Sequence, residues 1–386
     1  MEVIILAGGL GTRLRSVVQE VPKCMAPVGG RPLLSYLLDW LKMHSVDHVV
    51  FSVGYLKEQI IEYIQGEQWP FTYDFSIEET PLGTGGGIRL ALDYCRERRV
   101  YVLNGDSFFP VDLQQMPCTG ALTLALQRMR HFDRYGAVSL SGTRITAFQE
   151  KKYCEEGFIN GGVYALRRDR LDLKPFPEKF SFEKEVLEPM AKSGQLEGWD
   201  GDSYFIDIGI PEDYGRAQWE IPAWFDVQKA SEAVLKADAD TLFLDRDGVI
   251  NRLRPGDYVK SWEEFEYLPG ILQAIRQWSA KFRRLILVTN QRGVGKGLMS
   301  DRDLSRIHAR LMQDILEAGG KLDLILVCTS VDESDSRRKP QTGMFEEACA
   351  LFPDISARRS VMLGDSDSDD AFAKACGMPF IRLGQP

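Results

Sequence analysis

The stretch at residues 241–251, TLFLDRDGVIN, decides the fold. Its apolar run at residues 242–244 is typical of a buried strand, and two acids, Asp245 and Asp247, follow it together with a turn glycine, Gly248. Residues two apart on extended backbone project to the same side, so both carboxylates could meet one ligand at the carboxyl end of the strand. The same residues also fit a strand that simply stops in a polar turn, and only the surrounding segments can separate the two interpretations.

Around this stretch, short apolar runs alternate with longer amphipathic segments. We expect strands at residues 3–6, 49–53, 100–103, 285–288, 324–327 and 361–363. We expect helices at residues 33–43 and 88–96. This alternation predicts an α/β fold with doubly wound, mostly parallel sheets, whose ligands bind at the carboxyl ends of the strands.

The length of the chain favours two domains, because 386 residues exceed what one hydrophobic core usually supports. Strand and turn signals lapse from about Trp219 to Ala239, where residues 225–236 are typical of a helix with alanines and mixed charges. We therefore predict a first domain over residues 1–222, a helical linker over 223–237 and a second domain over 238–386.

Composition indicates an ordinary soluble globular protein that can bury a sizeable core. Hydrophobic residues make up 44% of the chain, and the net charge of -9 argues against a nucleic-acid partner while leaving room for local phosphate sites. The N-terminus lacks a basic leader, no apolar segment approaches a membrane span, and the seven cysteines form no CxxC pair. We expect a cytoplasmic protein without a membrane partner, and a homo-oligomer is left open.

Near the N-terminus, residues 4–6 are typical of a strand that leads into a glycine-rich turn, AGGLGTRL, carrying Arg13. Glycines allow backbone N–H groups to approach a phosphate closely, and Arg13 adds a forked cation. This pattern predicts a phosphate-binding turn, although a tight connection between a strand and a helix would also explain it.

This turn and the motifs that follow it resemble, in order, those of the sugar-phosphate nucleotidyltransferases. Members of this family join a nucleoside triphosphate to a sugar 1-phosphate and release pyrophosphate. The further motifs are PKCMAP at 22–27, PLGTGG at 81–86, LNGD at 103–106, FQEK at 148–151, NGGVY at 160–164 and FIDIG at 205–209. The resemblance covers nearly all of residues 1–222 and implies a Rossmann-like domain.

The resemblance also implies roles for individual residues. Arg13 and Lys23 would be the catalytic cations, since two anions must approach each other during the reaction, and Asp106 and Asp207 would hold Mg²⁺. The nucleotide would be bound by Leu6, Gly8, Gly9, Gly11, Thr12, Glu79, Gly83, Thr84 and Gly85. The sugar phosphate would be bound by Glu150, Lys151, Asn160 and Gly162.

The nucleotide base is expected to be guanine. The PLGTGG stretch is similar to the base-reading loop of the guanylyl-type members, and a carboxylate from Glu78 or Glu79 suits the N1–H and N2–H donors of guanine. Both glutamates also fit solvated surface charges. GTP is therefore the expected nucleotide, with ATP and CTP as the alternatives.

Three later segments supply partners for Asp245. They are LVTNQ at 287–291, RKP at 338–340 and MLGDSDSD at 362–369, each next to an expected strand or helix end. Together with residues 245–248 they resemble the four motifs of the haloacid dehalogenase-type phosphatases. The resemblance implies that Asp245 is the nucleophile and that Asp247 is the acid and base of a phosphatase.

The remaining residues of this second site follow from the same resemblance. The phosphoryl group would be bound by Thr289, Asn290, Arg338 and Lys339. A second Mg²⁺ would be held by Asp245, Asp365 and the backbone carbonyl of Asp247, with Asp369 in a supporting place.

Within that superfamily, residues 245–251, 258–259, 268–270 and 289–294 are similar to the heptose bisphosphate and histidinol phosphatases, which have no large cap domain. Those relatives carry a zinc loop with four Cys and His ligands. The corresponding residues here are Cys328, Ser330, Asp335 and Arg337, so no structural zinc is expected. We expect this loop to be ordered by other means, such as a pair between Asp335 and Arg337 or Arg338.

The two resemblances describe consecutive reactions. A phosphatase that removes the 7-phosphate of a heptose 1,7-bisphosphate produces a heptose 1-phosphate, which is a substrate for a nucleotidyltransferase. We therefore expect a bifunctional enzyme that makes a nucleotide-activated heptose, with GDP-heptose as product. The alternatives are another sugar 1-phosphate or nucleotide, and a second domain with a different phosphatase specificity or with no catalytic role.

Overall fold

A computed structural model describes residues 1–9, 14, 18 and 20–384 of the chain. The chain divides into two compact units, Met1–Gln218 and Trp219–Pro386, which are called the first and the second unit below. Helix α5 (Pro211–Lys236) contains this division, so the helix expected at 225–236 begins earlier than its sequence pattern indicates. No helix in the described part of the chain is long and apolar enough to cross a membrane.

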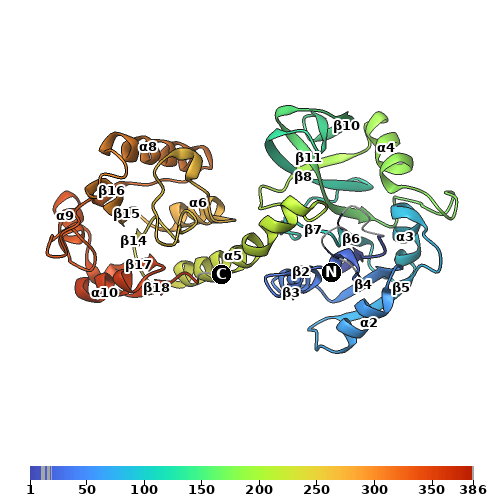
Figure 1. The fold of residues 1–386 in the computed structure, drawn as a ribbon. Helices are drawn as coiled ribbons and strands as arrows, with labels where there is room; N and C mark the ends of the chain where they lie inside the picture. Colours follow the sequence, from blue (N-terminus) through green and yellow to red (C-terminus); the bar gives the residue numbers. More distant parts are fainter. Residues whose placement is uncertain (10–13, 15–17, 19, 385–386) are drawn as a thin grey trace. The chain divides into compact units, whose positions relative to one another are not determined.

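The first unit is built on one mixed sheet of nine strands, in the order β5-β4-β1-β6-β11-β8-β12-β10-β9 (Figure 1). β5, β4, β1 and β6 are parallel, as the alternation of strands and helices predicts, whereas β11 runs antiparallel to both β6 and β8. The strands are β1 (Glu2–Leu6), β4 (His48–Val53), β5 (Thr72–Ile77), β6 (Arg99–Asn104), β8 (Leu122–Phe132), β9 (Gly136–Ser141), β10 (Arg144–Lys151), β11 (Cys154–Arg167) and β12 (Glu197–Asp200).

Helices cover this sheet: α1 (Leu33–Lys42), α2 (Lys57–Gln65), α3 (Gly83–Leu92) and α4 (Glu188–Lys192). The side chains of Ile4, Val50 and Val102 alternate out of β1, β4 and β6 into a buried cluster that also contains residues of α3 and α4. Two short pairs complete the unit: β2 (Pro27–Val28) with β3 (Arg31–Pro32), and β7 (Ser107–Phe108) with β13 (Ile206–Asp207). The second of these pairs carries Asp207, one of the residues predicted to hold Mg²⁺.

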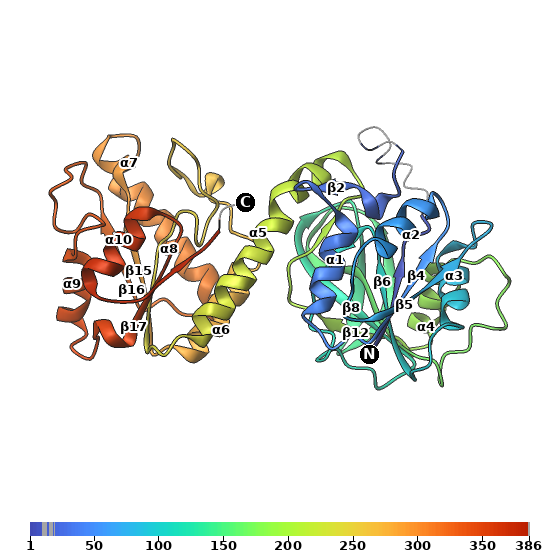
Figure 2. The ribbon, with the colours of Figure 1, turned by 90° about the horizontal axis from the view of Figure 1, so that it is seen from below.

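The second unit has a five-stranded parallel sheet in the order β16-β15-β14-β17-β18. Leu242 and Leu244 of β14 point into a cluster with α5, α6 and α8, whereas Phe243 points into one with α9 and α10, so both faces of the sheet are covered (Figure 2). The strands are β14 (Thr241–Leu244), β15 (Arg284–Asn290), β16 (Leu324–Cys328), β17 (Ser360–Gly364) and β18 (Phe380–Arg382). The helices are α6 (Ile271–Lys281), α7 (Arg292–Gly295), α8 (Asp301–Glu317), α9 (Gly343–Leu351) and α10 (Asp367–Cys376).

Candidate active sites

A cavity of about 380 Å³ lies in the first unit at the carboxyl ends of β1, β4 and β6. Parallel α/β sheets bind ligands at this edge, and the residues predicted from sequence gather there. The predicted residues that line it are Leu6, Gly8, Gly9, Lys23, Gly83, Thr84 and Asp106. The predicted residues Gly11, Thr12 and Arg13 lie outside the described part of the chain.

Lys23 connects the two predicted metal ligands of the first unit. It begins a short 3₁₀ helix, Lys23–Met25, and its Nζ lies 2.6 Å from Oδ2 of Asp106 and 3.2 Å from Oδ1 of Asp207. Asp106 follows β6, and Asp207 ends β13, whose pairing with β7 brings the two carboxylates together. Residues far apart in the sequence therefore meet at one edge of the cavity.

The charges at this edge fit a divalent cation. Burial and the neighbouring charge of Asp106 raise the pKa of Asp207. The charge of Lys23 and its hydrogen bond to Asp207 oppose this increase only in part. Two carboxylates sharing one lysine leave an excess of negative charge, and carboxylate oxygens are the ligands that Mg²⁺ prefers. A side chain at Gly209 would crowd this group, because a Cβ would lie 3.0 Å from Oδ1 of Asp207 and 3.3 Å from Nζ of Lys23.

The two consecutive glutamates have different positions. Glu78 lines the cavity, accepting hydrogen bonds from Oγ of Ser52 at 3.1 Å and from the N–H of Leu82 at 3.0 Å. A Cβ on Gly87 would lie 2.7 Å from its Oε1, so the glycine makes room for the carboxylate. Glu79, the residue assigned to the nucleotide from sequence, has a side chain that is 81% exposed and pairs with Lys57 at 3.2 Å. Glu78 therefore lines the described cavity and Glu79 does not, and a nucleotide-binding role for either glutamate stays a prediction.

The glycine-rich stretch after Pro81 forms the first turn of α3 and not a free loop, and α3 begins five residues before the helix expected at 88–96. Glycines are needed because the segment around Phe180 packs directly on this turn. A Cβ on Gly85 would lie 2.2 Å from the Phe180 ring, and one on Gly83, whose φ is +74°, would lie 2.6 Å from the Phe180 carbonyl oxygen. Gly85 therefore packs against Phe180 and does not line the described cavity, and its predicted contact with the nucleotide stays a prediction.

This packing also brings Glu183 to the cavity, a residue that the sequence motifs did not indicate. Glu183 opens a π-helical turn, Glu183–Leu187, and its Oε2 accepts hydrogen bonds from the hydroxyls of Thr84 at 2.7 Å and Ser181 at 2.9 Å. π-helical turns are rare and frequently occur at functional sites.

The four predicted sugar-phosphate residues separate into two pairs. Asn160 and Gly162 lie at an irregularity of β11, where Gly162 donates its N–H to Oδ1 of Asn160 at 2.8 Å. Gly162 has φ +74°, and a Cβ there would lie 2.5 Å from Nδ2 of Asn104, which lines the cavity. Glu150 and Lys151 are exposed at the end of β10 and do not line the described cavity. Their binding role stays a prediction.

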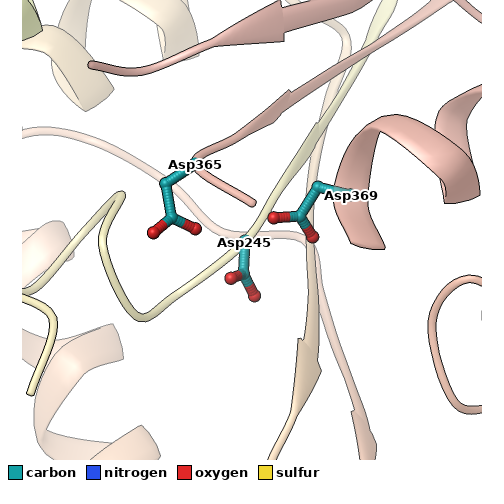
Figure 3. A group of neighbouring side chains, drawn as sticks. All are labelled: Asp245, Asp365 and Asp369. Carbon is teal, nitrogen blue, oxygen red and sulfur yellow. The ribbon is translucent and has the colours of Figure 1, made fainter. Parts of the chain in front are cut away.

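In the second unit, three carboxylates converge at the carboxyl ends of the parallel strands (Figure 3). Asp245 follows β14, Asp365 follows β17 and Asp369 lies in the first turn of α10, with one oxygen from each lying within 4.8 Å of the others. Gly248, whose φ is +82°, passes so close that a Cβ would lie 2.1 Å from Oδ2 of Asp365. This acidic group of hard oxygen ligands fits a divalent cation.

Lys339 is the cation of this second site, and it is only 3% exposed. Its Nζ lies 2.7 Å from Oδ1 of Asp245 and 2.5 Å from Oδ1 of Asp369. Oδ2 of Asp369 is engaged by the Ser366 hydroxyl in the N-terminal capping box of α10. Asn290 fixes the lysine backbone, since its amide accepts the Lys339 N–H and donates to the Lys339 carbonyl, both at 3.0 Å. Asp369 therefore positions Lys339, and Asn290 acts on the backbone of Lys339.

The two acids of the opening stretch have opposite electrostatic surroundings. Burial raises the pKa of Asp245 to about 7, against the charge of Lys339 and with help from Asp369 and Asp247. Burial also acts on Asp247, but the charge of Arg246 and hydrogen bonds from Asn251 and Gln291 outweigh it and lower the pKa of Asp247. Gln291 also donates to Oγ1 of Thr289 at 2.9 Å, which places the predicted phosphoryl-binding threonine beside Asp247.

Residues 329–338, the loop in which no structural zinc is expected, are ordered by hydrogen bonds. Arg338 donates to the Val331 carbonyl at 2.9 Å and to Oε1 of Glu333 at 3.1 Å, and Asp335 accepts the backbone N–H of Arg337 at 2.9 Å. The expected pairing of Asp335 with an arginine side chain is thus replaced by a backbone contact. In this arrangement the Arg338 guanidinium holds its own loop, and its predicted contact with the phosphoryl group remains a prediction.

The sequence of the first unit matches the family model for nucleotidyl transferases over residues 2–223. The chain belongs to the nucleotidyl transferase family. It is 45% identical over 226 residues to D-glycero-alpha-D-manno-heptose 1-phosphate guanylyltransferase of Aneurinibacillus thermoaerophilus, which covers 57% of this chain and 98% of the relative. The crystal structure of HddC from Yersinia pseudotuberculosis complexed with GMP-PN is 34% identical, with a TM-score of 0.52, and the match covers 56% of this chain and 97% of HddC.

The second unit of this nucleotidyl transferase has relatives of its own. Residues 336–384 match the family model described as HAD-hydrolase-like. The chain is also 42% identical over 129 residues to D-glycero-alpha-D-manno-heptose-1,7-bisphosphate 7-phosphatase of Mycobacterium tuberculosis, covering 33% of this chain and 68% of the relative. The α/β class and the fusion of two enzyme families, both expected from the motifs, are confirmed.

Proposed function

We propose that this chain carries out two consecutive reactions in the synthesis of GDP-heptose. The second unit removes the 7-phosphate from a heptose 1,7-bisphosphate, and the first unit transfers GMP from GTP to the resulting heptose 1-phosphate, releasing pyrophosphate. The observation that carries the proposal is that each unit holds its own lysine between two carboxylates, one of which, Asp106 or Asp245, follows a strand of the parallel part of its sheet. The names of the relatives of both units support the choice of substrates.

In the first unit, the sugar phosphate oxygen attacks the α-phosphorus of the nucleotide, and pyrophosphate leaves in line. Lys23 neutralises phosphate oxygens as the two anions approach, which requires it to release Asp106 and Asp207. Those carboxylates would hold Mg²⁺, whose charge offsets the repulsion between the phosphates. Glu78 accepts the N1–H and N2–H donors of guanine, which adenine lacks in this arrangement.

In the second unit, an oxygen of Asp245 attacks the phosphorus and forms an aspartyl-phosphate, while Asp247 gives a proton to the departing sugar oxygen. Asp247 then takes a proton from water, which releases phosphate and restores Asp245. The lowered pKa of Asp247 suits the second step, and the negative charge of a bound phosphate would raise that pKa for the first. Asp245 and Asp365 would hold Mg²⁺, whose charge keeps the nucleophile ionised despite its burial.

Phosphorus NMR of the full chain with heptose 1,7-bisphosphate, GTP and Mg²⁺ tests the proposal. We expect the signal of inorganic phosphate first, and then the signals of pyrophosphate and of a nucleoside diphosphate sugar. Asp245→Asn should lower phosphate release by at least about 10³-fold and leave transfer to supplied heptose 1-phosphate unchanged. Asp367→Asn is the control, because this aspartate lies in the same unit, two residues after Asp365, and its side chain is 99% exposed.

Two outcomes contradict the proposal. Absence of phosphate release by the unmodified chain would remove the phosphatase step, and loss of both activities in Asp245→Asn would mean that the sites are not independent. Replacing GTP by ATP, CTP or UTP tests the base, and equal rates with all four nucleotides would contradict the role of Glu78.

A further inference from the structure

Arg246 stands between the nucleophile and the acid of the second site, and its side chain is completely buried. Nη2 lies 3.0 Å from both carboxylate oxygens of Asp247 and donates to Oε1 of Gln291 at 2.8 Å. Nη1 lies 3.3 Å from Nε2 of His308. One buried guanidinium therefore connects the acid of the phosphatase site with a histidine that is far from it in the sequence.

The contact defines the chemical state of His308. A guanidinium only donates hydrogen bonds, so Nε2 must present its lone pair, and the imidazole is neutral with its proton on Nδ1. His308 lies on the buried face of α8 and is 8% exposed. Burial and the charge of Arg246 lower the pKa of His308 to about 4, against the opposing charge of Asp247, so the neutral form persists across the physiological range.

A buried N–H group without an acceptor costs about 1–3 kcal/mol, and Nε of Arg246 has no hydrogen-bond partner in the described part of the chain, so the acceptors of Nη1 and Nη2 are the ones that hold the guanidinium. Asp247 and Gln291 both accept from Nη2, and His308 supplies the acceptor for Nη1. Without the His308 acceptor, the Arg246 side chain would rotate so that Nη1 meets another acceptor. The two bonds from Nη2 to Asp247 would then change position as well. The acceptor on α8 thus limits where the carboxylate of the acid can lie.

We propose that His308 is a positioning residue for the phosphatase reaction, which fixes the guanidinium of Arg246 and thereby the carboxylate of Asp247. The inference rests on the phosphatase function proposed for the second unit. His308 contacts Arg246 and not the nucleophile, so it acts on the rate through the placement of the acid. Binding of the phosphate, which depends on other groups, is left unchanged.

Three variants of the full chain test this role with heptose 1,7-bisphosphate and Mg²⁺. His308→Ala removes the acceptor and should lower kcat by roughly 10- to 100-fold with KM unchanged, as is typical for groups that orient a reacting residue. His308→Gln places an amide oxygen near the position of Nε2 and should restore kcat to within about 3-fold of the unmodified chain. Leu304→Ala, at another buried position of α8, should reduce stability without this loss of kcat.

A second readout does not depend on activity. In ¹⁵N-histidine NMR of the full chain, which has four histidines, the signal that disappears in His308→Gln belongs to His308. It should report a neutral ring protonated on Nδ1 down to about pH 5, since Arg246 and Asp247 are the charged groups that act on it. Hydrogen exchange in β14 and β17, which measures the unfolding of the second unit, verifies that each variant is folded.

The results separate the two proposals. If the unmodified chain releases no phosphate, the proposed function fails before His308 is considered. If the chain is active but His308→Gln is as slow as His308→Ala, or Leu304→Ala is equally slow, His308 is a packing residue and the inference is wrong. A protonated His308 at pH 6 would also overturn it.

Discussion

Both candidate sites place a lysine between two carboxylates, but the carboxylates of the second site are much more buried than those of the first. In the first unit, Lys23 lies between Asp106 and Asp207, whose side chains are 41% and 29% exposed. In the second unit, Lys339 lies between Asp245 and Asp369, whose side chains are 12% and 0% exposed. Each lysine contacts two carboxylates, one of which follows a parallel strand, yet one group faces a cavity and the other is enclosed.

This difference matches the two reactions. A transferase must admit a nucleotide and a sugar phosphate together, so its lysine has to exchange carboxylate partners for phosphate oxygens in a space that water also enters. A phosphatase that forms a bond to its own aspartate has to hold the nucleophile in one orientation, which an enclosed lysine provides. We therefore expect the enclosed lysine to support both folding and catalysis, and the open lysine to support catalysis alone.

The largest effect is expected for Lys339→Met. Removing one partner of a buried ion pair leaves uncompensated charge and should lower the free energy of unfolding of the second unit by about 3–5 kcal/mol. Phosphate release should fall by at least about 10³-fold, whereas nucleotidyl transfer should persist. Hydrogen exchange in β14 and β17 and the two activity assays measure this. Lys374→Met is the control, since that lysine pairs with Asp370 on the surface and is 74% exposed.

The Lys23→Met substitution tests the open site in the same way. Nucleotidyl transfer should fall by about 10²- to 10³-fold, because a cation that meets the phosphates in the transition state is lost. The free energy of unfolding of the first unit should change by less than about 1 kcal/mol, since water reaches both carboxylates. Kinetics with GTP and heptose 1-phosphate, together with hydrogen exchange in β1 and β6, test both parts. A loss of stability as large as that of Lys339→Met would remove the distinction between open and enclosed sites.

A smaller effect on the free energy of unfolding is expected for replacing glycines, and it depends on how much space surrounds each one. Gly248→Ala combines a φ of +82° with a Cβ 2.1 Å from the Asp365 carboxylate, and should destabilise the second unit by about 2–4 kcal/mol and reduce phosphate release. Gly256→Ala, with φ +76° and open space around it, measures the cost of φ alone, about 1–2 kcal/mol. Gly9→Ala in the first unit has nothing within 4 Å of its Cβ and should leave unfolding unchanged. Equal values for Gly248→Ala and Gly256→Ala would contradict the tight fit.

The smallest effect concerns the adjacent glutamates at the open site. Glu78→Gln should reduce the preference for GTP over ATP by roughly 10- to 100-fold, because one carboxylate acceptor for guanine is lost. Glu79→Gln is the matched control and should change kcat/KM by less than about 2-fold, since its side chain pairs with Lys57 at the surface. The ratio of kcat/KM for the two nucleotides is the measurement. The reverse order of the two variants would return the assignment to Glu79.

Much of both sites could be predicted because acids directly follow buried strand segments. The runs expected at 3–6, 100–103, 242–244 and 361–363 all lie in strands of the structure, and the predicted residues Asp106, Asp245 and Asp365 come just after the ends of three of these strands. A parallel sheet brings such ends together whatever their separation in sequence. The antiparallel strands β8 to β11 were not predicted, because β11 mixes exposed and buried positions and is interrupted between Asn160 and Tyr164.

The details that the sequence did not provide depend on single contacts. Glu78 and Glu79 are identical neighbours, and only the end of β5 determines which of them faces the cavity. Arg246 and His308 are 62 residues apart, and the periodicity of α8 predicts a buried face without indicating which residue it meets. Glu183 reaches the cavity because Phe180 packs on the glycines of α3, a contact between segments that no local pattern reveals.

The two lysine contacts also differ in how early they can form while the chain is being synthesised. The contact between Lys23 and Asp207 joins residues 184 positions apart, and both residues belong to the first unit, which is synthesised first. The contact between Lys339 and Asp369 needs a residue synthesised on the order of 10 s later, at typical elongation rates. A nascent or prematurely terminated chain can therefore hold the transferase constellation without the phosphatase one. Interrupted translation would yield an enzyme that consumes heptose 1-phosphate but cannot make it.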